Sequence, residues 1–389
     1  MNTVAMRRID IEAPSILGRV LIADDQRHIL DALQLLLKGS GFSTEAVTDP
    51  AHVVTALEAS EFDAVLIDLN YTRDTTGGRE GLELVSRIRS IDKLVPVVVM
   101  TAWSSVELAV EAMRRGASDF VQKPWENREL LQKLQHQVSR GQARQRTQRL
   151  RESELQEARE IQGKLIPKKL PEIDGYEVAG TTQPLRFVGG DYYNVARISP
   201  HRTVLCIADV AGKGMPAALL MSSLQATLKP LIAQNLAPRD LCYRMNRILC
   251  DLTPVGKFVS FFYGILDNKE NRLTYCNAGH NPPLLVRVDG SSAELKAAGA
   301  VLGQFPQWFY EQSEVQLRSG DRLLIFTDGL VEACNTEEEQ FGEESVLRIA
   351  RENPGTSARD LLSRLLSAAA QHCGQSFQDD ASLIVLKAI

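Results

Sequence analysis

The chain has 389 residues, of which 44% are hydrophobic and 24% are charged. This length exceeds what one ordinary hydrophobic core accommodates, so we expect two or three domains in a globular protein. The net charge of -5 argues against nucleic acid as the main partner, because a surface that binds nucleic acid carries a basic excess.

The sequence also argues against an exported or membrane protein. The six cysteines are scattered without a C-x-x-C pair, which is typical of reduced thiols that pack as small core residues. The N-terminal segment lacks the long apolar stretch of a signal peptide. No run approaches the roughly 20 apolar residues of a membrane helix. We therefore expect a cytoplasmic protein with no membrane partner.

Residues 18–135 alternate short apolar runs with segments in which apolar residues recur at helical spacing. The apolar runs predict strands at Arg19–Ala23, Ser43–Val47, Ala64–Ile67, Val95–Met100 and Phe120–Gln122. Five such strand–helix units predict a small, doubly wound α/β domain with a parallel sheet. In that architecture, ligands bind beyond the carboxyl ends of the strands.

The segment from Leu130 to Leu165 has no strand pattern and almost no Gly or Pro, and its Gln, Arg, Glu and Leu content favours a helix. Pro167 and Pro171 are expected to end this helix. The middle of the segment is rich in Arg and poor in apolar residues, so no sustained heptad seam runs through it. Two interpretations remain open: a solvated spacer helix, or a helix pair that forms a homodimer.

From Tyr176 onward, strand-like runs outnumber helices. We expect strands at Tyr176–Gly180, Val204–Ala208, Phe258–Leu266, Arg272–Cys276, Pro283–Val288, Arg322–Phe326 and Ser382–Leu386. Helices are expected after Met215, after Pro238 and near Ala358–Ala370. The turn sequences DNKEN and VDGSS indicate antiparallel hairpins. The pattern predicts an α+β domain or a layered αββα domain.

Polar residues follow four of the five strands expected in the first domain. Asp24 and Asp25 follow the first strand, Asp68 the third, Thr101 the fourth and Lys123 the fifth. Because these strand ends share one rim, three carboxylates there predict a site for a hard divalent cation, with a lysine available to bind an anion. Taken singly, the paired aspartates also fit a helix N-cap, and the lysine fits an ordinary surface residue.

This segment, with the ordered set D-D, D, T, K-P, resembles the receiver domain of two-component response regulators, which implies a flavodoxin-like fold. The resemblance implies that Asp68 accepts a phosphoryl group from a cognate histidine kinase. The implied Mg²⁺ site comprises Asp24, Asp25, Asp68 and Asn70, and the implied phosphate and switch contacts are Thr101, Lys123 and Phe120. The loop DLNYTRDTTGGREG after the acceptor departs from the family pattern, because it is longer and has no proline.

Five aspartates in the second half border or interrupt apolar, strand-like runs. They are Asp191 in VGGDYYN, Asp209 in IADVAGKG, Asp328 in IFTDGLV, and Asp379 and Asp380 in QDDASLIVL. Converging, partly buried carboxylates repel one another unless a cation lies among them. Oxygen ligands without a nearby Cys/His set suit Mg²⁺ or Mn²⁺, so the pattern predicts a two-metal hydrolytic centre that acts on a phosphate. Each acid alone also fits a turn-forming residue.

From about residue 150 onward, the chain resembles metal-dependent serine/threonine protein phosphatases of type 2C. The likeness is to the bacterial branch of the sporulation stage II and stress-response phosphatases, and AREIQGKLIPKKLPEIDGYEVAG is similar to the usual entry of that branch. The implied metal ligands are Asp191, Asp209 (bridging two ions), the carbonyl of Val210, Asp328 and Asp379, with Asp380 as the alternative to Asp379.

Three further polar residues lie near these motifs. His280 either lines the cleft or is a structural residue of a turn, and Lys213 either steers an anion or is simply exposed. Arg186 is a candidate phosphate clamp, since guanidinium matches phosphate oxygens.

Together, these features predict a response regulator whose output is metal-dependent hydrolysis of phosphoserine or phosphothreonine on a protein. The resemblance implies a phosphorylated anti-anti-sigma protein as substrate, and the alternative is a non-enzymatic adaptor that binds partners through a phosphatase-like fold. We expect an N-terminal tail (1–17), a receiver domain (18–135), a helical linker that is also the candidate dimerisation element (136–168) and a phosphatase domain (169–389).

Overall fold

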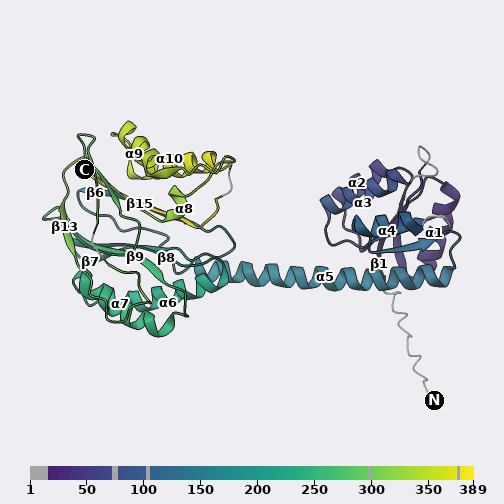
Figure 1. The fold of residues 1–389 in the computed structure, drawn as a ribbon, viewed down its shortest axis with the longest axis horizontal. Helices are drawn as coiled ribbons and strands as arrows, with labels where there is room; N and C mark the ends of the chain where they lie inside the picture. The colour runs from purple at the N-terminus through teal and green to yellow at the C-terminus, as the bar shows by residue number, and fades with distance from the viewer. Residues whose placement is uncertain (1–15, 72–77, 102–105, 297–298, 375–376) are drawn as a thin grey trace, which may run out of the picture. The chain divides into compact units, whose positions relative to one another are not determined.

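The computed structural model describes residues 16–71, 78–101, 106–296, 299–374 and 377–389. The chain divides into two compact units between Glu152 and Ser153 (Figure 1). Part of the unusual loop after Asp68, residues 72–77, lies outside the described residues. In the described ranges, no helix combines the length and the apolar character needed to cross a membrane.

The first unit is built on a five-stranded parallel sheet, as the sequence predicts. Its strands lie in the order β2-β1-β3-β4-β5. They are β1 (Gly18–Ala23), β2 (Phe42–Val47), β3 (Ala64–Asp68), β4 (Val97–Thr101) and β5 (Asp119–Gln122). The helices are α1 (Arg27–Gly39), α2 (Pro50–Ala59), α3 (Arg79–Ile91), α4 (Val106–Arg114) and the start of α5. Alternate residues of the central strands enter cores on opposite faces, with Leu21 in one and Val20 in the other.

The helix α5 (Asn127–Gln162) begins in the first unit and ends in the second. Leu130, Leu134 and Val138 bury its first turns against the first unit. The helix ends at Gln162, slightly before the predicted end of the helical segment at about Leu165, and a tight turn follows in which the Leu165 amide donates to the Gln162 carbonyl.

The second unit is a sandwich of two antiparallel sheets with helices outside each sheet, which confirms the predicted αββα layering (Figure 1). One sheet has the order β13-β10-β9-β8-β7 and the other β12-β11-β14-β15-β6. The strands of the first sheet are β7 (Tyr192–Ser199), β8 (Arg202–Val210), β9 (Val259–Asp267), β10 (Arg272–Ala278) and β13 (Ser313–Gln316). Those of the second are β6 (Tyr176–Gln183), β11 (Leu284–Val286), β12 (Ser292–Glu294), β14 (Arg322–Phe326) and β15 (Ala381–Ala388).

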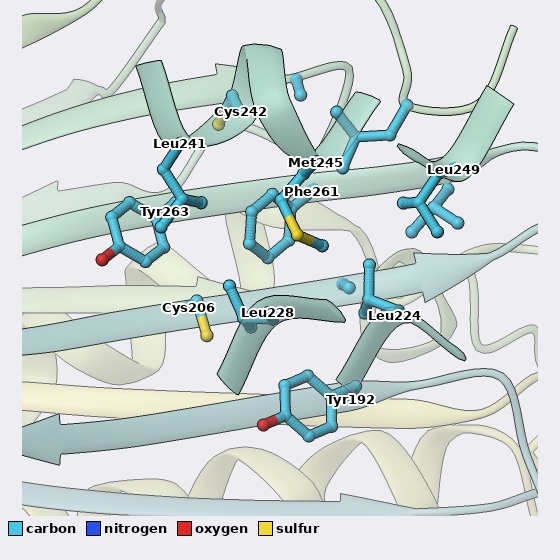
Figure 2. Close-up of a cluster of buried hydrophobic side chains, with 14 of the residues drawn as sticks. Tyr192, Cys206, Leu224, Leu228, Leu241, Cys242, Met245, Leu249, Phe261 and Tyr263 are labelled. Atoms are coloured by element: carbon cyan, nitrogen blue, oxygen red, sulfur yellow. The ribbon is translucent and has the colours of Figure 1, made fainter. Parts of the chain in front are cut away.

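Two helices cover the first sheet and three cover the second. They are α6 (Met215–Ile232) and α7 (Pro238–Leu252), then α8 (Asp328–Val331), α9 (Gly342–Glu352) and α10 (Ala358–His372). In the core between the first sheet and its helices, Leu228 of α6 and Met245 of α7 cluster with Phe261 of β9 (Figure 2). A further core fills the space between the two sheets.

Three strands that the sequence pattern does not predict are β7, β12 and β13, and each lies at the edge of its sheet. The apolar pattern of β12 and β13 is weak because these edge strands bury little side-chain area, and all three residues of β12 are exposed. This reason does not apply to β7, whose Tyr192, Tyr193 and Val195 are buried. The expected hairpins DNKEN and VDGSS are confirmed as the connections β9–β10 and β11–β12.

We predict that Leu228→Ala lowers the free energy of unfolding of the second unit by about 2–5 kcal/mol, because it leaves a cavity in a fully buried core. Leu219→Ala, on the same helix but 64% exposed, is the matched control and should change it little. Urea denaturation followed by circular dichroism measures both, and equal effects would contradict this account of the core.

Candidate functional site

Three aspartates of the first unit cluster at the carboxyl ends of β1 and β3. One carboxylate oxygen from each of Asp24, Asp25 and Asp68 lies within 4.8 Å of the others. Lys123 directly follows β5, and its ammonium nitrogen is 2.7 Å from Asp24 Oδ2 and 2.8 Å from Asp68 Oδ2. Burial raises the pKa of Asp68, and the positive charge of Lys123 only partly opposes this. The cluster therefore has more negative charge than its lysine compensates.

The donor atoms of this cluster fit a hard divalent cation. Asp68 Oδ1 and Asn70 Oδ1 are buried and have no hydrogen-bond partner among the described residues. Buried polar atoms are normally satisfied, and oxygen-only donors suit Mg²⁺. Asp24 also accepts a hydrogen bond from the Gln26 amide at 2.9 Å, but the N-cap of α1 is Gln26, so the N-cap interpretation of Asp24 is wrong.

The two remaining receiver candidates differ in exposure. Thr101, the last residue of β4, is buried. Phe120 in β5 is 38% exposed, and the ammonium of Lys133 from α5 lies 5.1 Å from its ring centroid. Lys133 also donates a 2.8 Å hydrogen bond to the Phe120 carbonyl. The aromatic residue is therefore in direct contact with the long helix.

The acids of the second unit come from both sheets of the sandwich. Asp191 immediately precedes β7 and Asp209 is the penultimate residue of β8, both in the first sheet. Asp328 follows β14 as the first residue of α8, and Asp379 comes shortly before β15, both at the second sheet. The strand pairings place the start of β7 beside the end of β8, and the end of β14 beside the start of β15. Two acids from each sheet thus meet at one end of the sandwich.

The four acids are close enough that the charge of one raises the pKa of another. Burial raises the pKa of Asp209 to about 7, and the charges of Asp328 and Asp379 add to this rise. Burial and then the charge of Asp209 raise the pKa of Asp191 well above its usual value. Among the described residues, only the Asp24 cluster has three carboxylates all within 4.8 Å. The second-unit acids are therefore close enough to repel but more widely spaced than the first cluster.

The neighbouring acids Asp379 and Asp380 have different environments. Asp380 is buried and accepts hydrogen bonds from the amides of Leu185 at 2.7 Å and Gly190 at 2.6 Å. Asp379 is half-exposed and pairs with the Lys213 ammonium at 2.8 Å. The carboxylate of Asp380 is engaged in fixing the loop before Asp191, so the geometry favours Asp379 as the acid available to a metal.

Thr327 is a residue of this site that the sequence interpretation did not identify. Its hydroxyl donates to Asp191 Oδ2 at 2.8 Å and accepts from the Ser382 amide at 2.8 Å, which joins the two sheets. The other oxygen, Asp191 Oδ1, is buried without a partner among the described residues. This orphaned oxygen in an all-carboxylate donor set fits Mg²⁺ or Mn²⁺.

Glycines allow the close approaches that this site needs. A Cβ added to Gly190 would lie 2.9 Å from the Val210 carbonyl oxygen, so only glycine lets the Asp191 loop come this near to Val210. A Cβ at Gly329, next to Asp328, would overlap the Asp380 carbonyl.

The surroundings of His280 fit the structural one of its two interpretations. Its side chain is buried and hydrogen-bonds to Ser260 and to the Phe326 carbonyl. Lys213 pairs with Asp379, as described above. Arg186 lies beside Gly214 in the glycine-rich turn before α6.

Comparison with family models assigns each unit. Residues 20–135 match the response regulator receiver domain. Residues 199–389 match Stage II sporulation protein E (SpoIIE).

Two curated relatives are similar to this chain. Phosphoserine phosphatase RsbU of Bacillus subtilis (strain 168) is 28% identical over 65% of this chain and 74% of its own length. Phosphoserine phosphatase RsbP of the same organism is 29% identical over 46% of this chain and 45% of its own length. The chain therefore spans less than half of RsbP.

Two solved structures are also similar. The RsbU and RsbW domains of Rv1364c from Mycobacterium tuberculosis match with 26% identity and a TM-score of 0.50, covering 58% of this chain and 63% of that one. The SiaA-PP2C domain of Pseudomonas aeruginosa has the same fold, with 19% identity and a TM-score of 0.55, over 62% of this chain and 98% of that one.

We predict that Asp209→Asn stabilises the metal-free protein at pH 8 but not at pH 4. The folded-state pKa of about 7 exceeds the unfolded value of about 3.9, so the folded state loses stability as the pH rises between these values. Asp209→Asn has no carboxyl group to ionise and so avoids this loss of folding free energy. From the difference between the two pKa values, we expect the loss in the wild type to be roughly 2–4 kcal/mol. Urea unfolding with a chelator measures it, with exposed Asp251→Asn as control. A parallel pH dependence in the wild type and Asp209→Asn would refute the repulsion.

Proposed function

We propose a function from the premise that the chain joins a response regulator receiver domain to a phosphatase domain of the Stage II sporulation protein E family. The second unit is a serine/threonine protein phosphatase domain of the type 2C class. Its proposed reaction is the hydrolysis of phosphoserine or phosphothreonine on a protein, under the control of Asp68 phosphorylation. The observation that carries this proposal is the convergence of acids from two sheets, which raise one another's pKa.

In this proposal, a metal centre is held by Asp191, Asp209, Asp328, Asp379 and the carbonyl of Val210. Two Mn²⁺ or Mg²⁺ ions bound there would acidify a water molecule and polarise the phosphoryl oxygens. Thr327 fixes one oxygen of Asp191 and leaves the other free to bind. Asp380 holds the amides of Leu185 and Gly190 and so shapes the loop that carries Asp191. The reaction needs no covalent enzyme intermediate.

The proposed substrate is a phosphorylated anti-anti-sigma protein, and the proposed phosphodonor of the receiver is a histidine kinase. The names of RsbU and RsbP as phosphoserine phosphatases support the phosphoserine part of this assignment. We also propose that the reaction takes place in the cytoplasm and that α5 is the element through which two copies would pair.

The route of regulation that we propose is α5. Near its start, Lys133 contacts both the ring and the carbonyl of the receiver residue Phe120. At its last residue, the buried side-chain amide of Gln162 bonds twice to the Gly189 backbone. The Gln162 Nε2 donates to the Gly189 carbonyl at 2.7 Å, and the Gln162 Oε1 accepts from the Gly189 backbone N–H at 3.1 Å. Gly189 lies two residues before Asp191. One continuous helix therefore has a receiver contact near one end and a contact with the metal-site loop at the other.

We predict that Asp328→Asn reduces Mn²⁺-dependent hydrolysis to near the background rate, because it removes a charged oxygen ligand from the centre. Asp240→Asn, an exposed change of the same charge on α7, should retain the wild-type rate. The assays are hydrolysis of an aryl phosphate and release of phosphate from phosphorylated anti-anti-sigma proteins of the same genome. Full activity in Asp328→Asn would refute the metal assignment.

We further predict that Asp68→Ala and Gln162→Ala each abolish the change in rate that a small-molecule phosphodonor produces. The first variant cannot be phosphorylated, and the second loses the clamp on Gly189. Asp68→Ala should keep the basal, metal-dependent rate, since Asp68 belongs to the other unit. Gln148→Ala, whose exposed amide bonds only Glu152 within α5, is the control for Gln162→Ala. Normal stimulation of Gln162→Ala would exclude this route.

A further inference from the structure

The proposed metal centre depends on the spacing of two sheets that are not hydrogen-bonded to each other as strands. Asp209 belongs to one sheet and Asp328 follows a strand of the other. Any side chain that bridges the sheets directly beneath these acids therefore influences how far apart they lie.

His280 is such a bridge. Its Nδ1 is 2.8 Å from the hydroxyl of Ser260 on β9, and its Nε2 is 3.0 Å from the carbonyl oxygen of Phe326 on β14. Ser260 is the register partner of Asp209 in the β8–β9 pair. Phe326 is the last residue of β14, two positions before Asp328. A single imidazole thus connects the strand neighbour of one acid to the strand that leads into another.

The hydrogen bonds define the state of the imidazole. A carbonyl oxygen only accepts, so Nε2 carries the proton and Nδ1 accepts from the Ser260 hydroxyl. Burial lowers the pKa of His280 to about 4, which keeps the ring neutral. A neutral ring adds no positive charge that would compete with a cation nearby.

The backbone around His280 is fixed as well. The Asn277 side chain accepts from the His280 amide at 2.7 Å and donates to the His280 carbonyl at 2.9 Å. Between them, Gly279 has φ +68°, and a Cβ there would approach the Val301 backbone nitrogen to 3.0 Å. Contacts within its own loop and with two strands therefore fix the position of the ring. A side chain fixed in this way can keep the two strands at a defined separation.

We propose that His280 is a positioning residue that sets the separation of the Asp209 and Asp328 carboxylates and thereby the affinity of the centre for divalent cations. This inference rests on the proposed function, because it assumes that these acids bind the metal. His280 touches neither the metal nor the substrate in this role. Ser260 shares the role as the partner on β9.

The experiment measures Mn²⁺ binding to the full chain by isothermal titration calorimetry. The heat from Asp328→Asn, which keeps the receiver site, is subtracted to isolate the phosphatase centre. The variants are His280→Phe, which keeps a ring but loses both hydrogen bonds, and Ser260→Ala, which removes one of them. His372→Phe is the matched control, since His372 hydrogen-bonds to the Glu339 carbonyl on the helical side of the second sheet. Urea unfolding with a chelator gives the folded fraction of each variant.

We expect His280→Phe to weaken Mn²⁺ binding by about 10-fold, the lower end of the effect of removing a direct hydrogen-bond partner of a metal ligand, because His280 acts on the acids through Ser260 and the Phe326 backbone. Ser260→Ala should weaken it less, and His372→Phe should leave it unchanged. Hydrolysis by His280→Phe should recover at saturating Mn²⁺, because the ligands themselves remain.

An unchanged Mn²⁺ affinity of folded His280→Phe, with binding still abolished in Asp328→Asn, would overturn this inference alone. If His280→Phe does not fold, an unchanged affinity in Ser260→Ala would overturn it. Absence of Asp328-dependent Mn²⁺ binding in the wild type would overturn the proposed function together with the inference.

Discussion

Mutual repulsion between buried carboxylates is the constraint on which the second unit depends. The pKa of Asp209 rises to about 7 because burial disfavours its charge and because Asp328 and Asp379 are near. Without a scaffold, such groups would separate or become protonated. The sandwich opposes this by fixing each acid to a strand end, and four acids on two sheets are held at one place only as long as the two sheets keep their spacing.

The two units differ in how they stabilise their clustered carboxylates. In the first unit, Lys123 lies within 3 Å of two of the three clustered aspartates and supplies a positive charge of the chain itself. In the second unit, the ion pairs of the described residues reach the acids only through Lys213 and the half-exposed Asp379. Neutral groups hold the buried acids there: backbone amides hold Asp380, and the Thr327 hydroxyl holds Asp191. Such groups orient carboxylates without neutralising them, so the compensating charge is left to a cation.

The sequence predicts what depends on local pattern and misses what depends on contacts across the fold. Central strands such as β3 and β14 are continuous apolar runs. Asp68 ends the first and Asp328 follows the second by two positions, so the sequence pattern predicts both the strands and the acids next to them. Edge strands such as β12 have no buried face and leave no pattern. Thr327 and His280 could not be identified as bridges, because their partners lie between 20 and 136 positions away. The contacts that distinguish Asp380 from Asp379 cannot be found in the local pattern either, since they are made with the distant amides of Leu185 and Gly190; only the family resemblance ranked Asp379 first.

The surroundings of α5 explain why its sequence fits both a solvated spacer helix and a dimerising helix. Its first turns pack on the first unit, and even its internal glycine is required there, since a Cβ on Gly141 would approach the Pro96 side chain to 2.8 Å. From residue 142 to 161, its residues are exposed or half-buried, so they need no apolar stripe. The helix there rests on intrinsic propensity and on local pairs such as Gln148 with Glu152 at 2.7 Å, which contribute little each. In the route of regulation proposed above, a contact change near Lys133 would reach Gln162 through the chain only while this stretch stays helical. Substitutions in the exposed stretch would therefore alter the proposed coupling while leaving both cores untouched.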